Sequence, residues 1–135
     1  MKKTSLLNQP LSAVIAGMGH GDTLVIGDAG LPIPDGPQRI DLAVSQGVPA
    51  FLDVVKAVLS ELQIEGVIIA QEFAEKSPAL HAQLRDLLSS LLGDVPIEAV
   101  PHGALKTHTV DAKAVVRTGE YTPYANVILI AGVVF

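Results

Sequence analysis

Apolar residues recur along the chain with two different spacings, one typical of helices and one typical of strands. Leu11, Val14, Ile15 and Met18 follow the spacing i, i+3, i+4, i+7 and predict an amphipathic helix. The same kind of spacing predicts longer helices at residues 51–62 and 78–91, and a short helical turn is expected at residues 103–108. Short apolar runs predict buried strands at residues 23–26, 67–70, 97–100, 114–117 and 126–130.

The order of these elements indicates the fold class. Strands that alternate with helices and are apolar throughout are typical of a mostly parallel sheet covered on both faces. We therefore predict a three-layer α/β/α fold in which residues 1–135 form a single domain with a mostly parallel central sheet. Ligands bind such sheets at the carboxyl ends of the strands. The polar residues just after predicted strands are Asp28, Gln71, Glu72 and His102.

The composition excludes several classes of protein. With no cysteine, the chain has no disulfide framework, no thiolate metal site and no cysteine nucleophile. A net charge of -5 with nine scattered lysine and arginine residues argues against nucleic-acid binding. The most apolar run, residues 127–135, is about half the length that spans a bilayer. We therefore expect a soluble cytoplasmic protein with no membrane segment and no metal site.

Two polar residues near the first strand are candidates for chemistry. His20 lies between Gly19 and Gly21, and is either a loop histidine with a local hydrogen bond or a general acid or base. Asp28 either caps a turn or accepts hydrogen bonds from ligand hydroxyls, or it orients a histidine. The remaining acidic residues, Glu65 among them, are expected on solvated helix faces.

Further candidates lie in the second half of the chain. If their segment is helical, His102 and Lys106 share a face, and otherwise they form a surface pair. Tyr124, Ala125 and Asn126 precede the last strand, where they either read a polyhydroxyl ligand or form a turn packed on a proline. Because they start a strand whereas Asp28 ends one, either the last strand is antiparallel or these residues serve a neighbouring subunit.

Several blocks of residues together resemble the D-ribose pyranase (ribose mutarotase) family over the whole chain. They are Gly19-His20, Asp28-Ala-Gly-Leu-Pro-Ile-Pro34, Arg39-Ile-Asp41, Gln46-Gly-Val-Pro49, His102 with Lys106, Arg117-Thr-Gly-Glu120 and Pro123-Tyr-Ala-Asn126. The related fucose mutarotases depart from this pattern after Ala29 and at the Tyr-Ala-Asn block. Two glycines, Gly21 and Gly27, differ from the family pattern, and neither removes a functional group.

The resemblance implies an isomerase that interconverts the β-pyranose and β-furanose forms of D-ribose without a cofactor. It implies that His20 is the catalytic proton donor. It also implies a set of sugar-contacting residues, with Ala125 contributing through its main chain: Asp28, His102, Lys106, Tyr124, Ala125 and Asn126. The resemblance further implies a ring-shaped homo-oligomer, commonly a homodecamer of two pentameric rings, with sites between subunits. Two alternatives stay open, namely a sugar-binding module without catalysis and a mutarotase for another sugar such as fucose.

Overall fold

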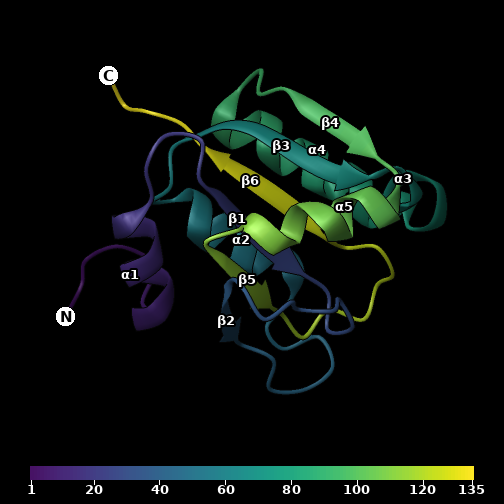
Figure 1. The fold of residues 1–135 in the computed structure, drawn as a ribbon, viewed down its shortest axis with the longest axis horizontal. Helices are drawn as coiled ribbons and strands as arrows, with labels where there is room; N and C mark the ends of the chain where they lie inside the picture. Colours follow the sequence, from purple (N-terminus) through teal and green to yellow (C-terminus); the bar gives the residue numbers. More distant parts are fainter.

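The computed structural model describes residues 1–135 and contains a six-stranded sheet with helices on both of its faces (Figure 1). The strands are β1 (Thr23–Gly27), β2 (Gln38–Asp41), β3 (Ile64–Ala70), β4 (Ile97–Val100), β5 (Ala114–Arg117) and β6 (Val127–Ala131). The helices are α1 (Gln9–Gly17), α2 (Phe51–Leu59), α3 (Gln71–Lys76), α4 (Pro78–Leu92) and α5 (His102–His108), and a 3₁₀ turn covers Thr109–Asp111. No helix has both the length and the apolar character needed to cross a bilayer.

The strand order is β2-β5-β1-β6-β3-β4. The pairs β1–β5, β2–β5 and β3–β4 are parallel, whereas β6 runs antiparallel to both of its neighbours, β1 and β3. The prediction of a mostly parallel sheet is confirmed, and the last strand is the antiparallel one. Ile26 near the end of β1 pairs with Val127 at the start of β6, so residues just before β6 lie beside residues just after β1.

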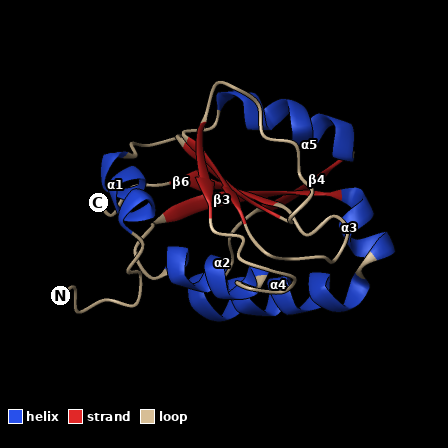
Figure 2. Ribbon diagram, turned by 90° about the horizontal axis from the view of Figure 1, so that it is seen from below, coloured by secondary structure: helices blue, strands red, loops and turns tan.

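Two cores of unequal size lie on the two faces of the sheet. Figure 2 shows α5 on one side and α2 and α4 on the other, which confirms the three-layer prediction. The larger core packs Phe51 of α2 and Leu84 of α4 against the sheet, and the smaller one packs Leu105 of α5 against Val25 and Ile128. Leu105 anchors α5 in this smaller core, so the first residues of α5 are held at the carboxyl ends of the parallel strands.

Two elements were not predicted from the sequence. β2 is an edge strand in which Ile40 alone is buried, so it has no apolar run by which to find it. α3 begins directly after β3 and buries only Phe73. A helical spacing cannot be recognised from a single buried residue, so the sequence did not predict α3 either.

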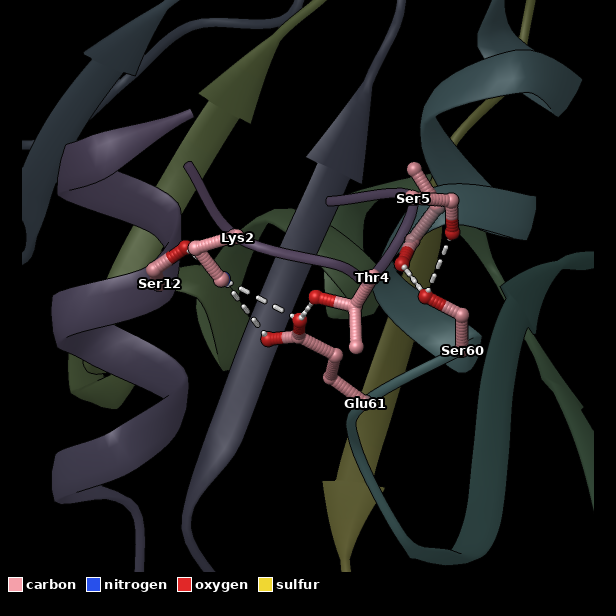
Figure 3. Close-up of polar contacts among 7 residues, drawn as sticks. Lys2, Thr4, Ser5, Ser12, Ser60 and Glu61 are labelled. Atoms are coloured by element: carbon pink, nitrogen blue, oxygen red, sulfur yellow. Dashed lines mark hydrogen bonds and ion pairs between the residues drawn. The ribbon is translucent and has the colours of Figure 1, made fainter. Parts of the chain in front are cut away.

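The segment before α1 is held against the end of α2 by polar contacts (Figure 3). Glu61 accepts a hydrogen bond from Thr4 Oγ1 at 2.6 Å and pairs with Lys2 Nζ at 3.1 Å. Ser5 Oγ donates to Ser60 Oγ at 3.0 Å. The hydrogen bond from Thr4 and then that from Lys2 hold the pKa of the Glu61 carboxyl below its ordinary value. These contacts lie far from the carboxyl ends of the strands and fix the N-terminal segment.

Candidate functional site

Asp28 and Asn126 meet at the centre of the carboxyl edge of the sheet. Asp28 follows β1 and Asn126 precedes the antiparallel β6, so the register of these strands brings residues 98 positions apart into contact. Asn126 Oδ1 accepts the backbone N–H of Asp28 at 2.9 Å, and Asn126 Nδ2 donates to Asp28 Oδ2 at 3.1 Å. Asp28 Oδ1 in turn accepts the N–H of Gly30 at 2.9 Å. The carboxylate is therefore held in a fixed orientation.

Burial raises the pKa of the Asp28 carboxyl above its ordinary value of 3.8. The hydrogen bonds from Gly30, Asn126 and Leu31, and the charge of His102, oppose this rise only in part. The Asp28 carboxylate keeps unused acceptor capacity, because an ionised carboxylate offers about four lone pairs, more than these donors fill.

His102 is the first residue of α5 and lies opposite Asp28 at the same edge. Its backbone N–H donates to Glu72 Oε2 at 3.0 Å, which ties the start of α5 to the helix that follows β3. Its ring meets the Tyr124 ring edge-on, with centroids 5.0 Å apart and an interplanar angle of 90°. The Nδ1 atom of His102 is buried and has no hydrogen-bond partner. Such an atom is costly to leave unpaired, so Nδ1 has the capacity for one further hydrogen bond.

A cavity of about 300 Å³ lies between these side chains. Its walls are Asp28, Gly30, Leu31, Pro32, His102, Lys106, Pro123, Tyr124 and Asn126. The volume is at the lower end of the range of small-molecule sites, about 300–1,000 Å³. It therefore suits a ligand of monosaccharide size, and the aspartate, asparagine and lysine offer both acceptors and donors to hydroxyl groups.

Most of the residues predicted for the site come together here, and two do not line the cavity. Ala125 is fully buried, and its backbone N–H donates to the carbonyl of Thr122 at 3.4 Å. It lies behind Tyr124, whose φ of 63° is the only positive value among the non-glycine residues. This left-handed conformation directs the chain so that Tyr124 and Asn126 both face the cavity while the alanine between them packs in the core.

His20 is the second exception. It precedes β1 whereas Asp28 follows it, and a strand of five residues is about 16 Å long at roughly 3.3 Å per residue. Within one chain, His20 therefore lies at the opposite end of the sheet from the cavity. Its Nε2 atom is 2.8 Å from Glu65 Oε2, and both side chains are about half exposed. The expectation that Glu65 lies on a helix face was wrong, because it belongs to β3.

Comparison with known proteins agrees with this geometry. The model of the RbsD / FucU transport protein family matches residues 1–134. This chain belongs to that family. Relatives within the RbsD/FucU family include a D-ribose pyranase of Symbiobacterium thermophilum, 60% identical over 135 residues, and one of Photobacterium profundum, 58% identical over 139 residues. Each comparison covers the whole of both chains. The resemblance noted in the sequence is confirmed.

Two solved structures share the fold. RbsD of Bacillus subtilis, complexed with D-ribose, superimposes with a TM-score of 0.90 at 45% identity, over 100% of both chains. A fucose mutarotase of Streptococcus pneumoniae, in complex with L-fucose, gives a TM-score of 0.86 at 23% identity, also over the whole of both chains. At 23% identity, the similarity to the fucose mutarotase shows a shared fold alone.

Proposed function

We propose that this protein is an isomerase that interconverts the β-pyranose and β-furanose forms of D-ribose. The observation that carries the proposal is the cavity at the end of β1, where Asp28, Asn126 and the unpartnered Nδ1 of His102 converge. Relatives named D-ribose pyranase, at 60% and 58% identity over the full length, support the choice of sugar. We keep the cytoplasm as the predicted location.

The sugar is held by the residues that line the cavity. The Asp28 carboxylate accepts hydrogen bonds from ring hydroxyls, and the amide of Asn126 keeps that carboxylate in place. His102 Nδ1 and Lys106 offer further polar contacts, and the Tyr124 ring closes one wall. Ala125 takes part through the main-chain turn that places its two neighbours.

The reaction needs one group that gives a proton and takes it back. The anomeric hydroxyl loses its proton, the bond between C1 and the ring oxygen breaks, and that oxygen is protonated, which leaves the open aldehyde. After rotation about a carbon–carbon bond, another hydroxyl attacks C1 and loses its proton, and the aldehyde oxygen takes up a proton to become the new anomeric hydroxyl of the smaller ring. An imidazole can both give and take a proton at neutral pH, and acid–base help of this kind typically contributes about 10²–10⁴-fold. We assign the proton donor to His20, without a cofactor.

Because His20 lies at the other end of β1, we propose that it acts in the cavity of a neighbouring subunit. The side chain is 61% exposed in the isolated chain and is therefore free to enter a second copy. The assembly we propose is the homodecamer of two pentameric rings that the family resemblance implies. This arrangement makes the catalytic site incomplete in a monomer.

The first experiment is saturation transfer by NMR between the anomeric protons of D-ribose near neutral pH. We expect transfer between β-pyranose and β-furanose to be accelerated by the protein. His20→Ala should abolish the acceleration while line broadening of ribose shows that binding survives. Binding without acceleration by the unmodified protein would instead identify a sugar-binding module. Acceleration with L-fucose and not with ribose would identify a mutarotase for another sugar.

A complementation experiment tests the shared site. His20→Ala and Asp28→Asn each disable every site in a uniform oligomer. Unfolding the two variants together and refolding them as a mixture creates some sites with an intact His20 and an intact Asp28 from different copies. We expect part of the activity to return only in the co-refolded mixture. Activity no higher than that of the separate variants would contradict a site shared between subunits.

A further inference from the structure

We infer that Glu65 is a positioning residue for His20, holding Nε2 so that Nδ1 exchanges the proton with the sugar. This inference rests on the proposed function and adds a residue that neither the sequence nor the family resemblance identified. The contact itself is a distance of 2.8 Å between His20 Nε2 and Glu65 Oε2, across 45 residues of sequence.

Glu65 occupies an irregular place in its strand. On β3 the register moves from Ile64, opposite Ala131, to Gly66, opposite Ile130, so two steps along β3 match one step along β6. Glu65 is therefore the extra residue of a β-bulge. Bulges bend a strand and change the direction of a side chain, and they are frequent beside active sites. In this strand the bulge accompanies a glutamate whose carboxylate reaches His20.

The approach of the two strands around Glu65 is close. A Cβ atom on Gly132, just after β6, would lie 3.1 Å from Glu65 Cβ and 3.3 Å from Glu65 N. The N–H of Gly132 donates to the carbonyl of Gln63 at 2.9 Å, which fastens the chain beyond β6 to the residues before Glu65. The backbone of Glu65 is thus held on the side that faces the end of β6.

The turn that carries His20 is fastened to the same end of β6 from the other side. Gly21 donates its N–H to the carbonyl of Ala131 at 2.9 Å, and Ala131 donates to the carbonyl of Asp22 at 2.8 Å. Inside the turn, Asp22 Oδ2 accepts the N–H of Gly19 at 2.8 Å. His20 and Glu65 therefore reach toward each other from segments that are both hydrogen-bonded to the chain at the end of β6.

The contact decides which nitrogen of His20 does chemistry. A carboxylate accepts and does not donate, so Nε2 carries a hydrogen when it contacts Glu65. The imidazolium then has one remaining proton, on Nδ1, to give to the ring oxygen, and the neutral ring that results has its lone pair on Nδ1 to take a proton back. Holding Nε2 thereby fixes both the orientation and the tautomer of the imidazole ring. Hydrogen-bond partners of catalytic histidines commonly have this effect.

The kinetic test compares Glu65→Ala, Glu65→Gln and the matched control Glu98→Ala. Glu98 is an exposed glutamate of β4 whose side chain makes no hydrogen bond or ion pair. A misplaced catalytic group costs up to about 100-fold, so we expect Glu65→Ala to lower kcat by about 10- to 100-fold with KM changed less than about twofold. Glu65→Gln keeps an acceptor oxygen and should recover part of the rate. Glu98→Ala should match the unmodified protein. Full activity of Glu65→Ala would overturn the inference.

A double-variant comparison separates positioning from a general structural role. Glu65→Ala should leave ribose affinity unchanged both in the unmodified protein and in a His20→Ala background, because it acts only through the imidazole. A loss of ribose affinity of the same size in both backgrounds would contradict a role through His20.

The ¹⁵N signals of the His20 ring give a readout that does not need catalysis, with assignment from the signals lost in His20→Gln. We expect the neutral ring of the unmodified protein to show a protonated Nε2 and an unprotonated Nδ1, and Glu65→Ala to move both shifts toward a mixture of the two tautomers. Identical ring shifts in the two proteins would overturn the inference. If the unmodified protein fails to accelerate ribose exchange, the proposed function fails, and these signals still decide whether Glu65 positions His20.

Discussion

The side chain of Asn126 contacts Asp28 twice, accepting its backbone N–H at 2.9 Å and donating to its carboxylate at 3.1 Å. Asn126 is almost fully buried, so neither bond competes directly with bulk water. The pair joins the end of β1 to the start of β6 and at the same time orients the carboxylate at the centre of the cavity. One residue therefore contributes both to the fold and to the site.

Asn126→Ala removes both bonds and leaves the Asp28 N–H and part of its carboxylate without partners. We expect the free energy of unfolding to fall by about 1–3 kcal/mol, the typical cost of an unsatisfied buried group, and ribose affinity to fall with it. Urea unfolding and ribose titration measure the two effects. Asn8→Ala is a matched control, because it removes the helix-capping bond to the Leu11 N–H, about 1 kcal/mol, far from the cavity. Unchanged ribose affinity in Asn126→Ala would contradict the role given to this pair.

The raised pKa of Asp28 predicts a pH-dependent cost to stability. Because the folded state binds this proton more tightly than the unfolded state, stability is lost as pH rises from about 3.8 through the raised pKa. Asp28→Asn cannot ionise, so its stability relative to the unmodified protein should improve as pH increases over that window and stay constant above it. Thermal unfolding of both proteins between pH 3 and pH 8 measures the difference. A difference independent of pH, or one of opposite sign, would contradict the burial argument.

The layers of the fold could be predicted because they depend on the period of apolar residues. β1 shows a second signal, a continuous apolar run, because Leu24, Val25 and Ile26 are all fully buried. β2 could not be predicted, because an edge strand with Ile40 as its only buried residue has no period. The direction of β6 was also not determined by its sequence, since a buried apolar strand has the same pattern in either direction.

The sequence could predict only those residues of the candidate site that come directly after a strand. Asp28 and His102 follow strands, and they meet as expected. Asn126 precedes a strand, and its place depended on the direction of β6. The sequence did not identify Glu65, because a single acidic residue in a strand cannot be told from any other solvated position. Its β-bulge could not be predicted either, because a bulge depends on how two strands pair, and the spacing of apolar residues carries no information on pairing.

His102 offers a test of ligand binding that spares the fold. His102→Phe keeps a ring that can meet Tyr124 edge-on and removes Nδ1, the buried atom that lacks a partner. We expect stability to be retained or slightly improved, since an unpaired polar atom is costly, and ribose affinity to fall about tenfold, or 1.4 kcal/mol. Ribose titration and thermal unfolding check the two parts. Unchanged ribose affinity would show that Nδ1 has no partner in the bound sugar.

Gly119 offers a test of how the loop between β5 and β6 shapes the cavity. A Cβ atom there would lie 2.5 Å from the carbonyl oxygens of Ser45 and Val48 and 2.6 Å from Val48 N. These are backbone atoms, so the two loops must separate to admit a methyl group. The hydrogen bonds that join the loops, from Gly119 N to Pro49 O at 2.9 Å and from Gly47 N to Gly119 O at 2.6 Å, are then strained.

We expect Gly119→Ala to lower the free energy of unfolding by about 1–3 kcal/mol, the usual cost of overpacking. Because the loop continues to Pro123 and Tyr124, which line the cavity, we also expect weaker ribose binding. Gly17→Ala is the matched control, since a Cβ at the end of α1 meets nothing within 4 Å, and it should be neutral or stabilising. Equal stability of the two variants in urea would mean that the loops separate without cost, and that the cavity wall does not depend on their contact.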